Sequence, residues 1–331
     1  MFRINNLVSI ITPCYNGEKT IARLMDSILN QTYKKIEFIL INDGSTDKTE
    51  EIAKDYEEKF VEQGMIFKYI YQENQGLGGA INTGLKHFTG EFLCWPDADD
   101  YLEPTSVEER VNFLENNSDY AVVTSNAYIR NENDLDNPKL LIEKVTDNIL
   151  RKNQFDLMLN GDSVFCPGCH MVRTEAFLQV NPNREIYTAK RGQNWQLLLP
   201  IYYKFNRGFL DRPLYNYIIY RNSMTKGDNT VCKWLARYDE HEDILMHTFA
   251  MIEEVQKADL QNERIFAKKQ YAYLRMHTAL FYSEYKLFDK EFKIKKKYGI
   301  EKRDIIDLIR RYIKPLNKLY IRMKKAQKKA G

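Results

Sequence analysis

The sequence predicts an α/β fold with a mainly parallel central sheet, followed by a helical C-terminal region. Two observations support this prediction. In the first 125 residues, short runs of β-branched and apolar residues alternate with segments of helical periodicity, which is the pattern of successive βαβ units. From residue 231 to about 290 the apolar spacing is helical, and neither Pro nor Gly interrupts it.

The elements of the first 125 residues follow in order. Residues 7–12 form a β-branched, apolar run that Pro13 ends, because proline has no N–H to donate to a ladder. The next segment, 18–30, carries apolar side chains at helical spacing, and Thr46 or Asp47 can cap the helix that follows the second strand. We expect strands at 7–12, 36–41, 65–71, 92–95 and 120–124, with helices at 18–30, from about 46 to 60, 76–87 and 104–116.

Residues 126–229 mix short strand-like and helix-like segments, and pattern alone does not order them. We expect a first domain over residues 1–229 with a division near residue 125. A helical region over 230–290 and a basic tail over 291–331 follow.

Charge is distributed unevenly around a net value of +3. Residues 290–331 contain 16 Lys and Arg against 4 Asp and Glu, so they carry +12 and residues 1–289 carry −9. We therefore expect an anionic surface as the partner of the tail alone.

The N-terminal segment lacks the charged and apolar regions of a signal peptide, and no apolar run approaches the roughly 18 residues that span a bilayer. The five cysteines are odd in number and scattered, which favours reduced thiols. We expect a cytoplasmic protein.

A cluster of carboxylates stands at the end of the fourth expected strand. Residues 91–95 are strand-like, Pro96 stops the pairing, and Asp97, Asp99 and Asp100 follow at once. Ligands of open α/β sheets bind at the carboxyl ends of the strands. Three such acids repel one another unless a cation or an array of hydrogen-bond donors lies between them. Mg²⁺ or Mn²⁺ is the matching hard ion. An acidic loop that caps the next helix is the alternative, and a calcium-binding loop fits poorly, because Leu102 stands where that loop needs Gly.

The other strand ends also carry polar residues. Tyr15 follows the first strand and could stack on a base, whereas Asp43 follows the second and could accept from a base N–H or a ribose hydroxyl. The glycines of residues 76–79 let backbone approach a ligand closely. Their spacing is neither the GxGxxG of a dinucleotide site nor a P-loop.

Four motifs, in this order, resemble those of the family 2 glycosyltransferases. They are residues 9–16, 42–47, 74–76 with 82–84, and 97–100. The resemblance covers about residues 6–225. It implies a glycosyltransferase A fold whose residues 1–125 bind a nucleotide-diphospho-sugar, most simply a UDP-sugar, and whose residues 126–229 bind the acceptor. It also implies donor contacts at Pro13, Tyr15, Glu18, Asp43, Ser45, Gly76, Asp97, Ala98 and Asp99, with Mn²⁺ or Mg²⁺ on Asp97 and Asp99.

The chain departs from the family pattern at the general base. Many members place a Glu-Asp pair before a Trp-containing helix, and this chain has Gln193-Asn194 there. An amide is no base at neutral pH, so three explanations remain open. Glu185 or Asp211 serves instead, the amides orient an acceptor that is already a good nucleophile, or the chain only binds.

Two further segments depart from, or lie outside, the family pattern. Relatives often place a His within the stretch that corresponds to residues 221–225, and Arg221 or Lys226 could meet the diphosphate charge instead. Residues 166–170 match the CxxCH pattern of haem attachment, which has no export signal to support it, and zinc would need further ligands. We assign His170 no role.

The basic tail has an amphipathic pattern, with aliphatic and Tyr positions flanked by Lys and Arg, and Pro315 is expected to kink it. This pattern suits the face of an anionic membrane better than a partner helix, and we expect no nucleic acid. The expected protein is an inverting, metal-dependent hexosyltransferase at the inner face of the membrane. It would transfer a sugar to a glycan in surface or capsular polysaccharide assembly. Transfer to a polyprenyl phosphate is one alternative, and a non-catalytic nucleotide-sugar-binding module is the other.

Overall fold

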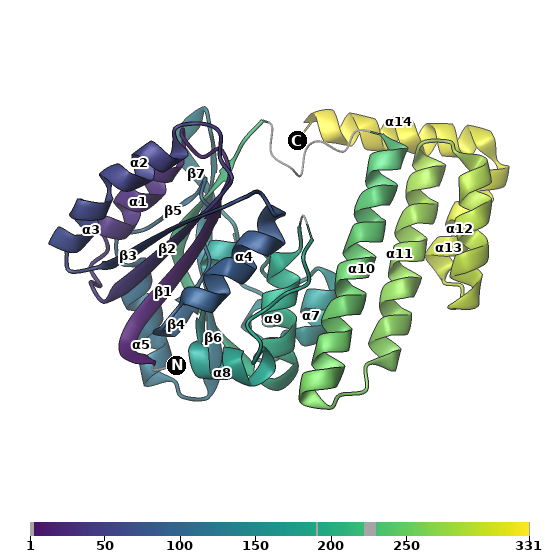
Figure 1. The fold of residues 1–331 in the computed structure, drawn as a ribbon. Coiled ribbons are helices and arrows are strands. Elements are labelled where there is room, and N and C mark those ends of the chain that lie inside the picture. Colours follow the sequence, from purple (N-terminus) through teal and green to yellow (C-terminus); the bar gives the residue numbers. More distant parts are fainter. Residues whose placement is uncertain (1–2, 190, 222–229, 331) are drawn as a thin grey trace. The chain divides into compact units, whose positions relative to one another are not determined.

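The computed structural model describes residues 3–189, 191–221 and 230–330, without the side chains of 328–330 (Figure 1). Its backbone divides into two compact units. The first comprises residues 1–221 with 254–256, and the second comprises residues 222–253 with 257–331. Each is described by itself.

A nine-stranded sheet forms the centre of the first unit (Figure 1). Its strands are β1 (Ile4–Cys14), β2 (Ile36–Asp43), β3 (Ile66–Gln72), β4 (Gly90–Cys94), β5 (Tyr101–Leu102), β6 (Tyr120–Asn131), β7 (Asp134–Leu140), β8 (His170–Arg173) and β9 (Asn206–Ile219). Their order is β3-β2-β1-β4-β8-β6-β9-β5, and β7 pairs with β6. The strands β1 to β4 are parallel, and β6 and β9 run in the same direction, because β8 is antiparallel to both β4 and β6. The predicted α/β class with a mainly parallel sheet is confirmed.

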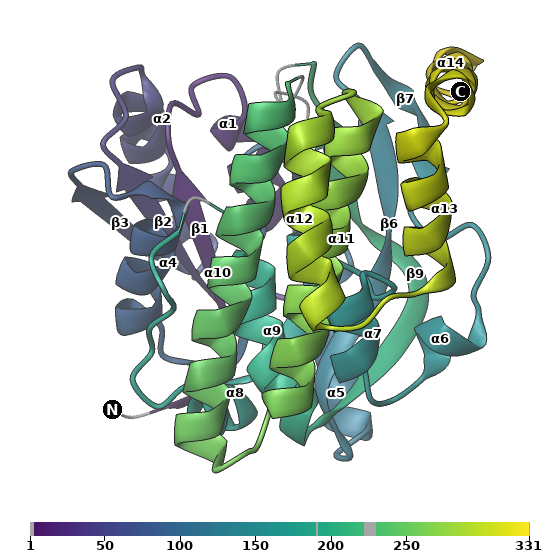
Figure 2. The ribbon, with the colours of Figure 1, turned by 90° about the vertical axis from the view of Figure 1, so that its right-hand side faces the viewer.

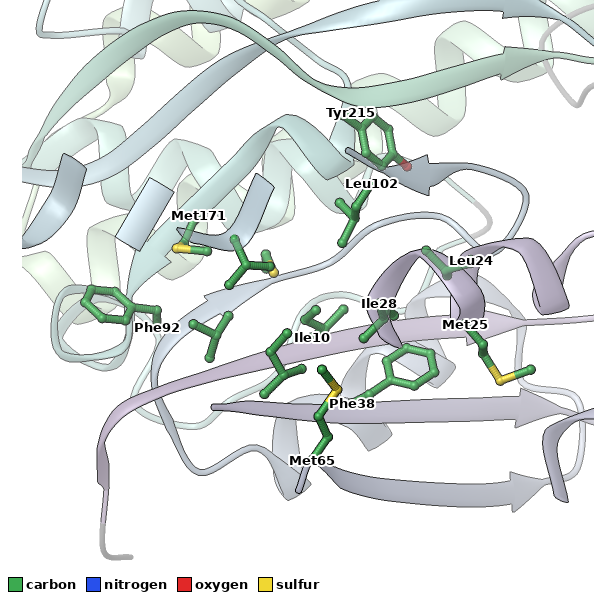
Figure 3. Close-up of a cluster of buried hydrophobic side chains, with 14 of the residues drawn as sticks. Ile10, Leu24, Met25, Ile28, Phe38, Met65, Phe92, Leu102, Met171 and Tyr215 are labelled. Carbon is green, nitrogen blue, oxygen red and sulfur yellow. The ribbon is translucent and has the colours of Figure 1, made fainter. Parts of the chain in front are cut away.

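Helices cover the sheet. They are α1 (Ile21–Leu29), α2 (Thr49–Asp55), α3 (Glu57–Glu62), α4 (Gly76–His87), α5 (Ser106–Asn116), α6 (Asp147–Leu150), α7 (Phe155–Asn160), α8 (Thr174–Val180) and α9 (Gln193–Lys204). Side chains of α1 and of the buried strands form the main core cluster, in which Ile28 lies with Ile10 and Phe38 (Figure 3). The helix α4 packs closely on the sheet at Gly84, where a Cβ would fall 2.3 Å from Cγ2 of Ile11.

The sequence pattern after residue 125 does not predict how the segments pair. In the structure, the main feature of this region is a long pair of strands. The strands β6 and β9 pair in parallel over most of their length, with irregular register between residues 125 and 128. Short helices α6 to α9 and a 3₁₀ turn at Pro167–Cys169 fill the connection between β7 and β9. Such pairing joins residues about 85 positions apart, so local periodicity could not reveal it.

The second unit is helical, with α10 (Val231–Gln256), α11 (Gln261–Phe281), α12 (Tyr285–Lys297), α13 (Lys302–Tyr312) and α14 (Lys314–Ala330). The helices α10, α11 and α12 lie side by side (Figure 2). Instead of a kink at Pro315, α13 ends at Tyr312 and a new helix begins at Lys314, because proline fits the first turn of a helix, where its missing N–H is not needed. None of the described helices combines the length and the apolar character that crossing a bilayer requires.

Candidate active site

The carboxyl ends of β2, β1 and β4 lie next to one another at one edge of the sheet. Cys14 of β1 pairs with Asn42 of β2, and the Thr12 hydroxyl donates to the Pro96 carbonyl at 3.1 Å. The residues that follow these strands therefore share this edge. The sheet order brings Tyr15, Asp43 and Asp97 together, although more than 80 residues separate the first from the last.

Three carboxylates gather after β4. One oxygen from each of Asp97, Asp99 and Asp100 lies within 4.8 Å of the other two. Asp97 is half-buried, Asp99 is exposed and Asp100 is buried. Asp100 joins this loop to β9, because it accepts from the Tyr215 hydroxyl at 2.7 Å and from the Ile218 N–H at 2.7 Å. Asp97 and Asp99 are therefore the two carboxylates of the cluster that are not engaged with β9.

Crowding and burial make this cluster unfavourable when it is fully ionised. Burial, with the Asp99 charge as a second cause, raises the pKa of Asp97 to about 7. Burial also raises the pKa of Asp100 well above its ordinary value, and the charges of Asp99 and Asp97 add to the effect. Desolvation raises the pKa of Asp99 as well, and a hydrogen bond from its own backbone N–H and the Arg23 charge oppose this shift. A cation at this edge would relieve the repulsion.

The donor set fits a hard divalent cation. Carboxylate oxygens are the ligands that Mg²⁺ and Mn²⁺ prefer, and two free carboxylates leave coordination positions open for substrate phosphates. The residues that would hold the ion are Asp97 and Asp99, whereas Asp100 already accepts from two donors on β9.

A cation of the chain itself lies beside the cluster. Arg23, in the first turns of α1, donates from one amino group to the Asp99 carbonyl at 2.5 Å and to the Tyr220 hydroxyl at 2.7 Å. Its guanidinium lies 5.5 Å from the Tyr101 ring centroid. Sequence reasoning missed Arg23, because a basic residue within an amphipathic helix carries no local signal of a site.

Asp43 lies at the same edge and is buried. It accepts from the Gln72 amide at 2.7 Å and from the Gln75 N–H at 2.9 Å. These bonds fix the loop before α4, so the segment that begins with Gly76 is held next to the end of β2. Gly76 has a φ of +76° and open space where a Cβ would lie.

The loops after β1 and β2 are joined to each other. The Ser45 hydroxyl accepts from the Asn16 N–H at 2.9 Å, and the Glu18 carboxylate accepts from the Lys48 N–H at 3.3 Å. Ser45 and Glu18 therefore hold the two loops together, and their contacts with a nucleoside stay a prediction. Tyr15 is 56% exposed beside them, so its ring is available for stacking. Pro13 and Ala98, both half-buried, complete the predicted set at this edge.

The amide at the family's base position makes two hydrogen bonds within the protein. The Oδ1 of Asn194 accepts from the Trp95 indole at 2.9 Å, and its Nδ2 donates to the Phe165 carbonyl at 2.6 Å. A carboxylate could make the first bond and not the second. Asn194 therefore ties the end of β4 to the segment before Cys166.

Glu185, one candidate for the general base, lies beside α4. Glu185 pairs with Lys86 at 3.1 Å, in the last turn of α4 and shortly before β4 begins at Gly90. This is the amino edge of β4, so Glu185 lies at the opposite edge of the sheet from Asp97.

The other candidate, Asp211, lies within β9. It accepts from Asn126 at 3.0 Å. It stands four positions before Tyr215, about 13 Å along a strand. It therefore also lies apart from the aspartates.

The remaining predicted residues are placed as follows. His170 is buried within β8, and its Nδ1 lies 3.0 Å from the Thr124 hydroxyl, so it has no access to an external ligand. Cys166 is half-buried and Cys169 is buried. Arg221 donates its N–H to Glu132 at 2.9 Å, whereas residues 222–225 and Lys226 lie outside the described part of the chain.

Comparisons with known proteins agree with this geometry. The family model described as glycosyl transferase family 2 matches residues 9–180, which is more than half of the chain. The putative glycosyltransferase EpsE of Bacillus subtilis is 31% identical over 209 residues, which cover 63% of this chain and 71% of EpsE. An uncharacterized glycosyltransferase of Rickettsia typhi is 46% identical over 108 residues, which cover 33% of this chain and 32% of that protein. The chain spans about a third or less of the length of the Rickettsia relatives that it matches.

Two solved structures share the fold. Residues 1–349 of TarS from S. aureus, in complex with UDP-GlcNAc, match with a TM-score of 0.55 at 18% identity, covering 88% of this chain and 91% of that chain. The mannosyltransferase PcManGT from Pyrobaculum calidifontis, in complex with GDP-Man and Mn²⁺, matches with a TM-score of 0.54 at 14% identity, covering 96% and 84%. The order of the strands, the polar edge with its aspartates and the matched family model lead to one conclusion: the chain belongs to the family 2 glycosyltransferases and has the glycosyltransferase A fold.

Proposed function

We propose that this glycosyltransferase is metal-dependent and transfers a hexose from a UDP-sugar to a glycan acceptor, with inversion, in the assembly of a cell-surface polysaccharide. The observation that carries the proposal is the cluster of Asp97, Asp99 and Asp100, at the edge that also presents Tyr15 and Asp43. TarS, which shares the fold, was solved with UDP-GlcNAc, and this supports the choice of a UDP-sugar as donor.

The proposed reaction breaks the bond between the anomeric carbon and a phosphate oxygen and forms a bond from the acceptor oxygen to the same carbon. The electron pair of the broken bond leaves with the nucleoside diphosphate, and the proton of an acceptor hydroxyl passes to solvent. A bound divalent cation would stabilise this charge as a Lewis acid. Tyr15 and Asp43 would hold the nucleoside, and the guanidinium of Arg23 would lie near the diphosphate.

Release of UDP tests the proposal directly. The chain should release UDP from a UDP-sugar when Mn²⁺ is present and not in EDTA, and Asp99→Ala should abolish the release. Glu62→Ala, an exposed carboxylate on α3, is the matched control and should leave the rate unchanged. A pure binding module would show a thermal shift with UDP-sugars and no release, and this result would overturn the proposed catalysis. A panel of nucleotide-sugars with Mn²⁺ in the same thermal-shift assay would identify the donor.

One observation favours a second acceptor class. Both polar atoms of Asn194 are engaged, and neither Glu185 nor Asp211 lies with the aspartates, so no base is assigned to the acceptor hydroxyl. A polyprenyl phosphate is already an anion and needs no base. Parallel assays with a saccharide acceptor and with a polyprenyl phosphate would separate the two classes, because only the true acceptor should accelerate UDP release and take up labelled sugar.

We also propose that the basic C-terminal segment brings the enzyme to the anionic inner face of a membrane, as a peripheral protein. The support is the +12 charge of residues 290–331. Removing residues 300–331 should release the protein from anionic vesicles, and unchanged binding of the truncated chain would contradict this part of the proposal.

A further inference from the structure

The helix α13 buries three of its charged side chains and exposes its three isoleucines, although Leu308 packs on the core of this unit. Asp304, Asp307 and Arg310 are all buried. Ile305, Ile306 and Ile309 on the same helix are exposed. An amphipathic helix on a globular protein normally has the opposite orientation.

Paired charges hold this orientation. The Lys295 ammonium lies 2.8 Å from Asp304, and both side chains are fully buried. Arg310 lies 2.5 Å from Asp307, and the other oxygen of Asp307 lies 2.6 Å from His277 of α11. Rotating α13 to bury its isoleucines would separate these buried pairs, which is strongly unfavourable.

The start of α14 belongs to the same arrangement. Asn317 is buried, accepts from Arg310 at 3.0 Å and donates to the Leu280 carbonyl at 2.9 Å. The Arg310 guanidinium lies 3.5 Å from the centroid of the Tyr320 ring. The apolar positions of α14 beside Asn317 are therefore directed to solvent, as those of α13 are.

Together the two helices expose a series of large apolar residues at helical spacing, which we call the α13–α14 apolar surface. It consists of Ile305, Ile306, Ile309, Tyr312, Ile313, Leu316, Leu319 and Met323, each between 41% and 74% exposed. A patch of this kind marks an interaction site.

The charge around this surface identifies the kind of partner. After Glu301 the sequence contains only two acids, Asp304 and Asp307, and both are buried in ion pairs. The exposed charges that flank the apolar residues are therefore positive. They are Lys302, Lys314, Lys318, Arg322, Lys324 and Lys325. A second copy of the chain would bring like charges together, whereas an anionic bilayer offers both negative headgroups and an apolar interior.

We propose that the α13–α14 apolar surface inserts into the headgroup and acyl boundary of an anionic membrane, with the flanking Lys and Arg at the lipid phosphates. This inference deepens the membrane attachment proposed above and rests on it. It adds that the contact is apolar insertion by a folded two-helix surface in addition to electrostatic attraction.

Co-sedimentation of the full chain with vesicles tests the inference. Vesicles of phosphatidylcholine mixed with the anionic lipid phosphatidylglycerol are compared with vesicles of pure phosphatidylcholine. We expect binding to the anionic vesicles only, and at least a tenfold loss of affinity in the triple variant Ile305→Ser, Ile306→Ser and Ile309→Ser. Val61→Ser, which removes a 67% exposed apolar side chain from α3, is the matched control and should bind as the parent chain does.

A charge variant completes the design. Lys314→Glu, Lys318→Glu and Arg322→Glu together should also reduce binding at least tenfold. If the serine variant binds as well as the parent chain, the tail acts by charge alone and the insertion is refuted. If the parent chain forms a dimer without vesicles and the serine variant is a monomer, the surface is a contact between two copies instead. UDP release measured without vesicles should be the same for all these variants, so failure of the proposed catalysis is recognised separately.

Discussion

Replacing Asp97 by Asn should stabilise the metal-free protein and remove its response to metal. The carboxyl has an ordinary pKa of 3.8 in the unfolded chain and about 7 in the folded one, so folding favours its protonated form. The stabilisation from that proton is fully present below pH 4 and is lost as the pH rises towards 7. The rise in pKa sets a ceiling of about 4 kcal/mol on the cost of ionisation, and sharing among three coupled acids and partial exposure lower the expected effect to about 1–2 kcal/mol.

The assay is thermal unfolding in EDTA between pH 4 and 8. The Asn variant and the parent chain should melt together near pH 4, and the variant should melt about 2–5 °C higher at pH 8. Adding Mn²⁺ should raise the midpoint of the parent chain and leave the variant unchanged. Asp47→Asn is the opposite control, because hydrogen bonds from Thr49 and Glu18 outweigh burial and lower the pKa of Asp47, so this change should destabilise the protein above pH 4. An Asp97→Asn variant that is less stable than the parent chain in EDTA at pH 8 would refute this account of the cluster.

Three further substitutions test other parts of the structure. Asn194→Asp should lower the free energy of unfolding by about 1–3 kcal/mol, because a carboxylate cannot donate to the Phe165 carbonyl. It should not accelerate transfer, and a faster UDP release would show that a base at this position is used. Glu37→Gln should lower the free energy of unfolding by about 3 kcal/mol, because the buried carboxylate accepts charge-assisted hydrogen bonds from Ser9, Lys68 and Thr89. A denaturation midpoint equal to that of the parent chain would contradict this. Gly168→Ala should lower the free energy of unfolding by about 1–3 kcal/mol, because the new Cβ would lie 2.0 Å from the Tyr215 ring. It should also weaken the Mn²⁺ thermal shift, because the Tyr215 hydroxyl donates to Asp100 of the acid cluster. An unchanged thermal shift would show that Tyr215 does not affect the metal site.

The sequence was most informative at the ends of the first strands, where polar residues directly follow apolar runs. Apolar runs that end in Pro13, Asp43 and Asp97 placed the first strands and their polar ends, because a strand's length and its terminating residue are local properties. Four short motifs then indicated the family and the expected donor site. Local signals also placed the helical character of the region after residue 231.

The general base shows where local reasoning stops. Glu185 and Asp211 were reasonable candidates by residue type, and Asn194 lay at the family position. Only the folded chain shows that one acid pairs with Lys86 at the opposite sheet edge, that the other lies within β9, and that the amide is occupied. The position of each depends on pairing between distant segments, and spacing along the chain carries no information about it.

The sequence by itself determined the α/β class, the run of acids after the fourth strand and the amphipathic composition of the basic tail, because these depend on which residues are adjacent or at a fixed period. The tertiary structure decided that Arg23 lies beside Asp99, that Asp100 accepts a hydrogen bond from Tyr215 of β9, and that α13 exposes its isoleucines. Those outcomes depend on hydrogen bonds and ion pairs between segments far apart in the chain, and they are fixed only when the whole fold forms.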